Sequence, residues 1–234
     1  FSSRATVLAG NAAYKAALEL RGNLLDAAAA TLGAAADDLD FVPGAIEAAN
    51  GTRLPLADLA AAATPFTRPL AATVYFPAPH MTYAHGAVVA EVDLDADLGH
   101  VIPRGVWVSY DVGTVVNPKL VEAQIEGGAA QAIGGALLEE LTYESSGQLL
   151  AGSFVDYLLP TADGVPPIHH HDLGLSPSPL NPLGIKGAGE AGLVGVGAAI
   201  ANAVADALGE AAAVDRLPMT PERVWRWAHR EGAP

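Results

Sequence analysis

Apolar side chains recur at the three- and four-residue spacing of amphipathic helices in several stretches of the chain. The first such stretch follows Ser2 and Ser3, whose hydroxyls can cap a helix. Another follows Asn117-Pro118, which combines a capping side chain with a proline at the first helical position. The predicted helices cover 4–20, 24–32, 56–63, 117–140, 193–208 and 221–229.

Runs of apolar residues bounded by turn signals predict strands within 37–46 and at 86–94, 106–112 and 149–159. Residues 95–105 fit a connection within an antiparallel pair. Because strands and helices do not alternate regularly, we expect an α+β fold with mixed antiparallel strands and long glycine-rich helices. Neither a repeat nor a long linker divides the sequence, so residues 1–234 are predicted to form one domain.

Composition excludes several classes of function. The net charge of −14 opposes binding to nucleic acid or to an anionic membrane surface. The chain has no cysteine, which rules out disulfides, a thiol nucleophile and an iron–sulfur cluster of its own. No signal peptide or spanning segment is visible, and we expect a cytoplasmic protein. Since the sequence opens at Phe1 without an initiator Met, we expect it to be part of a longer or processed polypeptide.

The glycine-rich stretch 182–192 contains the strongest candidate chemistry. Lys186 and Glu190 stand among closely spaced glycines, and an apolar helix pattern follows. Glycine lets the backbone pass close to a bulky group, and a helix N-terminus favours a charged carboxylate. Glu190 is therefore a candidate general base pressed against a ligand. A solvated glutamate before a helix explains the pattern equally well.

The same stretch matches a dinucleotide fingerprint. Gly187, Gly189 and Gly192 spell G-x-G-x-x-G, and Glu210 stands where a ribose-binding acid would be. The fingerprint should follow a buried strand, however, and the preceding segment 176–182 contains three prolines. This interpretation is disfavoured, although a strand before Gly187 would revive it.

Several segments in order resemble the second half of the molybdopterin-binding large subunit of the xanthine oxidase family, which includes aldehyde oxidoreductases and aerobic carbon monoxide dehydrogenases. The resemblance covers nearly the whole chain. Its last motif, Glu190-Ala191-Gly192, is more similar to the carbon monoxide dehydrogenase-like and bacterial aldehyde oxidoreductase branch than to the mammalian xanthine oxidases. The matching segments are 2–4 with the following helix, 110–118, 122–128, 138–140, 156–160, 177–182 and 186–192.

The resemblance assigns roles to particular residues. Glu190 matches the family carboxylate that takes a proton from an oxygen bound to molybdenum. Gln124 matches a glutamine near the metal, although on residue type alone it would be an ordinary surface glutamine. Ser2 and Ser3 match residues around the pterin and its phosphate, and simple helix capping is their alternative role.

Three residues of the glycine-rich stretch join this expected cofactor-binding set: Lys186, Gly187 and Gly189. Pairing of Lys186 with Glu190, pairing with a partner chain and a purely structural role remain open. His169, His170 and His171 could bind a metal, but consecutive strand residues point to alternating faces. We therefore expect a polar edge there and no metal ligands from the protein.

The resemblance implies a component of a molybdenum hydroxylase that oxidises an aldehyde, an N-heterocycle or carbon monoxide. Its cofactor would be molybdopterin with molybdenum, with or without the cytosine dinucleotide extension. Iron–sulfur clusters and FAD would lie on partner chains. The expected partners are the N-terminal half of the large subunit, an iron–sulfur subunit and a flavin subunit, assembled as a dimer of heteromers. The alternative is a non-catalytic scaffold with the same fold and no cofactor.

Overall fold

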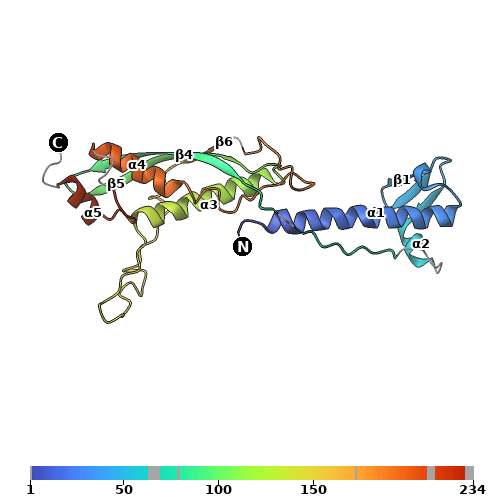
Figure 1. Ribbon diagram of the computed structural model, residues 1–234, viewed down its shortest axis with the longest axis horizontal. Helices are drawn as coiled ribbons and strands as arrows, with labels where there is room; N and C mark the ends of the chain where they lie inside the picture. Colours follow the sequence, from blue (N-terminus) through green and yellow to red (C-terminus); the bar gives the residue numbers. More distant parts are fainter. Residues whose placement is uncertain (1, 63–68, 78–79, 172, 210–213, 230–234) are drawn as a thin grey trace. The chain divides into compact units, whose positions relative to one another are not determined.

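The computed structural model describes residues 2–62, 69–77, 80–171, 173–209 and 214–229. Phe1 and Glu210 therefore lie outside the described residues, as does the predicted end of the helix 56–63. The chain divides into two compact units, residues 8–79 and residues 1–7 with 80–234. Helices and sheets occur in both units, which confirms the α+β class (Figure 1). The assignment of residues 1–234 to one cofactor-binding domain stays a prediction.

The unit of residues 8–79 packs one long helix against a small sheet. A π-helical turn, Thr6–Gly10, leads into α1 (Asn11–Leu32), which ends at the left-handed Gly33. The predicted break at Gly22 is absent, because the alanines and leucines around it favour the helix enough to offset one glycine. Three strands form an antiparallel meander that the short helix α2 follows. They are β1 (Leu39–Val42), β2 (Ala45–Ala48) and β3 (Arg53–Pro55), and α2 spans Leu56–Ala61.

The other unit is built on a three-stranded sheet in the order β4-β5-β6. Strand β4 (His85–Asp95) pairs antiparallel with β5 (His100–Asp111), as the sequence predicted. The predicted connection 95–105 is too long, because pairing continues to Asp95 and His100 and leaves a short turn at Gly99. Strand β6 (Ile168–His171) joins β5 in parallel, so the histidine run lies in a strand, as expected.

Helices pack on this sheet. Helix α3 (Pro118–Leu137) begins where the Asn117 side chain accepts a hydrogen bond from the Leu120 N–H, which confirms the predicted cap. Helix α4 (Val196–Leu208) lies along β4 and beside α3, and α5 (Pro221–Ala228) contacts β5 (Figure 1). Their shared core contains Val106, Val108, Ile125, Ile133, Val196, Ile200, Val204, Met219 and Val224.

The segment that follows α3 corrects the prediction of a strand at 149–159. A single bridge, Tyr143 to Leu149, is the strand-like pairing described there. The Ser153 carbonyl accepts hydrogen bonds from the Asp156 and Tyr157 N–H groups, which bend the chain into a turn. Five large apolar residues within 149–159 stay exposed instead of alternating into a core: Leu150, Phe154, Val155, Leu158 and Leu159. The run of apolar residues therefore did not signal a strand.

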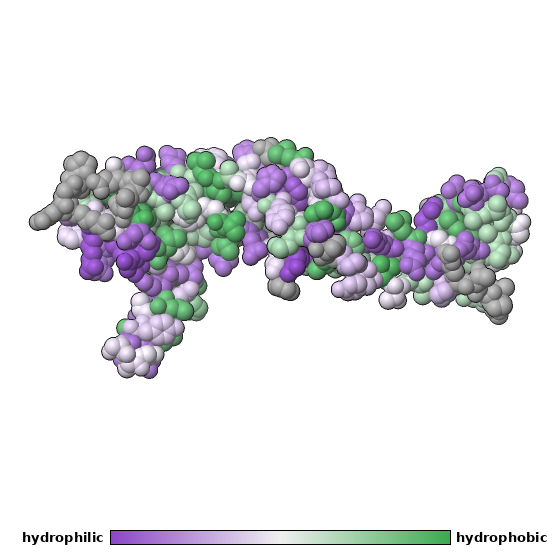
Figure 2. Space-filling view, viewed as in Figure 1, coloured by the Kyte–Doolittle hydropathy of each residue, from purple (hydrophilic) through white to green (hydrophobic). Residues whose placement is uncertain are grey.

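Hydrophobic and hydrophilic residues are interspersed on the visible face of the molecule (Figure 2). Exposed apolar side chains are found in both units, including Leu18 and Val89. Among the residues that the structure describes, none of the helices is both long and apolar enough to cross a membrane.

Candidate functional site

The glycine-rich stretch is fixed against the end of β5. The Asn181 side chain brackets the loop, since its Nδ2 donates to the Ile185 carbonyl and its Oδ1 accepts from the Ile185 N–H. Gly184 turns the chain at a φ of 68°. Its carbonyl then accepts from the Thr114 N–H at 3.0 Å, while the Lys186 N–H donates to the Val112 carbonyl at 2.8 Å. These bonds place the residues that follow at a defined position.

A buried ion pair reinforces this attachment. Lys186 Nζ lies 2.8 Å from Asp111 Oδ2, and the two side chains are 7% and 2% exposed. The other carboxylate oxygen, Oδ1, accepts from the N–H groups of Gly113 and Ser176. Burial works to raise the pKa of Asp111, but these hydrogen bonds and the Lys186 charge outweigh it and hold that pKa below its ordinary value. The Lys186 charge is therefore committed to Asp111.

The N-terminal segment reaches the candidate base directly. The Ser3 hydroxyl donates a hydrogen bond of 2.7 Å to Glu190 Oε2. Ser2 and Ser3 both adopt left-handed backbone, with φ of 56° and 52°. A Cβ added at Gly187 would lie 2.8 Å from the Ser3 carbonyl oxygen, and one added at Gly189 would lie 2.8 Å from the Ser3 hydroxyl. The two glycines thus make room for Ser3.

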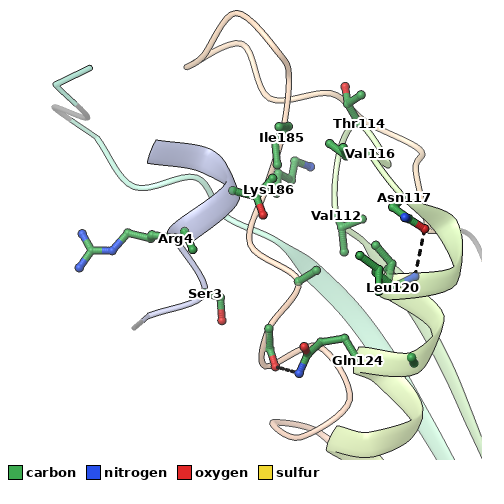
Figure 3. Close-up of a pocket in the computed structure, with 16 residues that line it drawn as sticks. Ser3, Arg4, Val112, Thr114, Val116, Asn117, Leu120, Gln124, Ile185 and Lys186 are labelled. Carbon is green, nitrogen blue, oxygen red and sulfur yellow. Dashed lines mark hydrogen bonds between the residues drawn. The ribbon is translucent and has the colours of Figure 1, made fainter. Parts of the chain in front are cut away.

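Helix α3 supplies the third side of the site. Gln124 Nε2 donates to the Gly189 carbonyl at 3.0 Å (Figure 3). One turn further, an added Cβ at Gly128 would lie 3.1 Å from the Gly192 Cα. The prediction that helix glycines mark close backbone packing is confirmed at Gly128, whereas Gly127 faces open space.

A pocket of ≈ 560 Å³ lies between these three segments. The Gln124 side chain and Ser3 border it, while the Arg4 guanidinium points away from the other labelled side chains (Figure 3). Hydroxyl, amide, cationic and apolar residues form its lining, and no Asp or Glu is among the described residues that line it. The full lining is Ser3, Arg4, Ala5, Thr6, Val112, Thr114, Val116, Asn117, Leu120, Val121, Ala123, Gln124, Ile185, Lys186, Ala188 and Gly189.

The structure brings together most of the residues that the sequence singled out. Ser3, Gln124, Lys186 and Gly189 border the pocket, and Glu190 is hydrogen-bonded to one of them. Ser2 is exposed and does not border it. Whether these residues bind a cofactor stays a prediction.

One detail of the expected geometry is wrong, and the structure excludes one of the alternatives left open for Lys186. Residues 189–195 form turns and α4 begins only at Val196, so Glu190 does not lie at a helix N-terminus. Lys186 pairs with Asp111 and not with Glu190. The physical reason is that the turns carry Glu190 away from the segment where Lys186 enters the protein interior.

Sequence reasoning missed Asp111 and Tyr110 as parts of the site. Burial, and after it the negative charge of Glu190, raises the pKa of Tyr110 above its ordinary value of 10.0. Both residues stand at the end of β5, inside a segment whose family resemblance was recognised. A carboxylate at a strand end, two residues before a glycine, could have indicated Asp111, but its lysine partner is remote in sequence.

The two alternative interpretations find little support. Ile185 forms only an isolated bridge with Gly113, so among the described residues no strand leads directly into Gly187, and a dinucleotide fingerprint lacks its context. In the histidine run, His169 stacks on Trp107 and His170 lies 3.8 Å from Glu126. Within the described ranges, no group of three His, Cys, Asp or Glu side chains could hold a metal ion.

Comparison with known proteins places this geometry in a family. Residues 1–166 match the family model of the molybdopterin cofactor-binding domain. The chain is 42% identical over 235 residues to the 6-hydroxypseudooxynicotine dehydrogenase complex subunit gamma of Paenarthrobacter nicotinovorans, covering 96% of this chain and 29% of that protein. It is 36% identical to the nicotine 6-hydroxylase large subunit of the same organism, again covering 96% and 29%.

Comparison with solved structures indicates the same family. Quinoline 2-oxidoreductase from Pseudomonas putida 86 superposes with a TM-score of 0.85 at 34% identity, covering 99% of this chain and 31% of that one. CO dehydrogenase from Oligotropha carboxidovorans gives 0.84 at 31% identity, covering 97% and 29%. The chain thus spans less than a third of the length of these relatives. It belongs to the molybdopterin cofactor-binding domain family of the molybdenum hydroxylases.

Proposed function

We propose that this chain forms one wall of the molybdenum-cofactor site of an oxidoreductase that inserts water-derived oxygen into a small molecule. The relatives named for nicotine and quinoline favour an N-heterocycle as substrate. The relative named for carbon monoxide keeps that gas as a second candidate, and an aldehyde is the third. The remaining wall would come from the N-terminal half of the large subunit, which the relatives' greater length supports.

The proposal rests on the meeting of three polar side chains beside one pocket. The base candidate Glu190, the Ser3 hydroxyl and the Gln124 amide come from segments far apart in sequence and meet beside one pocket. The pocket suits an anionic pterin cofactor, since a chain with a net charge of −14 lines it with hydrogen-bond donors and no described carboxylate. Gln124 and the backbone of Gly189 would hold it, with the cytosine dinucleotide form as one option.

The residues of this chain have separable tasks. When bound, the cofactor supplies the two-electron redox chemistry and the activated oxygen. Glu190 accepts a proton at its carboxylate, and the Ser3 hydroxyl holds one of its oxygens. One N–H of the Gln124 side-chain amide donates to the Gly189 carbonyl. The amide oxygen and the second N–H of Gln124 therefore remain for a ligand.

Electron removal requires partners. The chain has no cysteine to hold an iron–sulfur cluster. Iron–sulfur and flavin subunits would therefore complete the path, in a dimer of heteromers by family analogy. A scaffold of the same fold that binds no cofactor is the competing function.

Substitution of Glu190 tests the proposal. In the assembled enzyme, Glu190→Gln keeps the size and hydrogen bonding of the side chain but removes its ability to accept a proton. A positioned general base contributes about 10²–10⁴-fold, so turnover of N-heterocycles should fall by at least about 100-fold while bound molybdenum is unchanged. Glu91→Gln, at an exposed position on β4, is the matched control and should retain turnover.

Two results would count against the proposal. Turnover of Glu190→Gln within about threefold of the parent, far less than a base contributes, would refute the base assignment. Absence of molybdenum from the purified parent assembly would favour the scaffold.

A further inference from the structure

We propose that Ser3 is a positioning residue that orients the carboxylate of Glu190, and that its hydroxyl does not anchor a cofactor phosphate. This inference rests on the proposed role of Glu190 as the base. It reassigns Ser3 from the cofactor to the residue that performs the proton transfer.

The number of protons on a hydroxyl makes the two roles exclusive. A serine hydroxyl has one proton to donate and two lone pairs that accept. In the structure that proton points to Glu190 Oε2 over 2.7 Å, the length of a charge-assisted O–H···O⁻ bond. While this bond stands, the hydroxyl can accept hydrogen bonds but cannot donate one to a phosphate oxygen.

The backbone around Ser3 is arranged to bring this hydroxyl to Glu190. Ser3 has a φ of 52°, which a non-glycine residue adopts at some cost. Its carbonyl oxygen and side chain face Gly187 and Gly189, where an added Cβ would approach within 2.8 Å of each. The glycines before Glu190 therefore serve a contact within the chain as well as any ligand, and this contact fixes where the carboxylate can point.

Three neighbouring groups among the described residues do not replace this donor. After burial, the negative charge of Glu190 is the second cause that raises the pKa of Tyr110 on β5. Lys186 is held by Asp111, and Gln124 on α3 donates to the neighbouring Gly189 carbonyl instead of to the carboxylate. Loss of the Ser3 hydroxyl should then leave the Glu190 carboxylate less well oriented.

The test uses the assembled enzyme with Ser3→Ala and Ser3→Gly. Glycine suits the left-handed backbone, so the second variant should fold even if the first is strained. Both should keep the parent's molybdenum content and lower kcat by about tenfold while KM changes little. Ser146→Ala is the control, because the Ser146 hydroxyl also donates to a glutamate, Glu144, outside the pocket.

The outcomes separate the roles. Loss of molybdenum from both Ser3 variants would make Ser3 a cofactor anchor and overturn the proposal. Unchanged molybdenum with an unchanged kcat would overturn it as well. In a Glu190→Gln background, Ser3→Ala should have no further effect, since its target is gone. A collapse in Glu190→Gln with no effect of Ser3→Ala refutes the Ser3 role alone, whereas parent-like Glu190→Gln refutes the proposed function.

Discussion

Asp111→Asn is the most informative perturbation of the loop that presents Glu190. Asn has the size of Asp, and its Oδ1 can still accept from the Gly113 and Ser176 N–H groups. The substitution removes the negative charge opposite Lys186 Nζ. The Lys186 side chain, which is 7% exposed, then stays buried without its counter-ion. The variant therefore isolates the ion pair from the rest of the hydrogen-bond cluster.

The expected loss of stability is large for one atom exchanged. Breaking a buried pair by removing one partner costs about 3–5 kcal/mol. The value here should lie near the lower end, at about 3 kcal/mol, since two of the Asp111 hydrogen bonds survive. Replacing both partners, as Asp111→Asn with Lys186→Met, should recover much of that loss, because no buried charge is left and the asparagine oxygen still accepts from the two N–H groups.

The pH dependence of this loss follows from the direction of the Asp111 shift. Its pKa is lower in the folded protein than in the unfolded chain, so its contribution to stability is full above the unfolded value of about 3.9. That contribution is lost as the pH falls through the folded value. The stability difference between parent and Asp111→Asn should therefore be constant near neutral pH and shrink below about pH 4.

Equilibrium urea unfolding measures this difference, and hydrogen exchange of the amides in 184–190 reports the local effect. Asp93→Asn is the control, because Asp93 pairs with Arg104 at a surface where both side chains are more than half exposed. That change should cost at most about 1 kcal/mol. Equal losses for Asp93→Asn and Asp111→Asn would refute the view that the buried pair fixes the loop.

Two further predictions concern packing and cofactor retention. Gly192→Ala should lower the free energy of unfolding by about 2 kcal/mol or more, because its Cβ would lie 2.0 Å from the Ile125 carbonyl oxygen. Gly135 on α3 faces open space, so Gly135→Ala should raise that free energy by up to about 1 kcal/mol in the same urea titration. The opposite order would contradict the packing of α3 on the turns. The chain expressed alone should hold little molybdenum and oxidise no aldehyde, purine or carbon monoxide, because one wall leaves a cofactor open to water; stoichiometric metal with steady turnover, measured by metal analysis and dye reduction, would contradict the need for an assembly.

Local signals predicted much of the fold. Asn117-Pro118 located the start of α3, the predicted helix ends at 32 and 208 are those of α1 and α4, and an apolar run bounded by turn signals located β4. Predictions failed where tertiary contacts decide the outcome. The early part of β5 is paired by its neighbour and not by its own pattern, and residues 149–159 lack a partner strand.

The candidate site shows the same division. Closely spaced glycines marked the loop, and the family resemblance supplied Glu190 and Gln124. The spacing did not show that Lys186 turns inward to Asp111, since the two residues are 75 positions apart. Nor could it show that Gly187 and Gly189 admit Ser3, because that contact joins the start of the chain to its last third. Such contacts depend on the assembled sheet and become visible only in three dimensions.

A structure of the cofactor-loaded assembly would test the central claim most directly. We predict that the molybdenum cofactor lies against Ser3, Gln124 and Gly189, and that the Glu190 carboxylate faces the metal while it keeps its hydrogen bond from Ser3. A cofactor bound elsewhere in the assembly, or a Glu190 side chain directed away from the metal, would contradict the account.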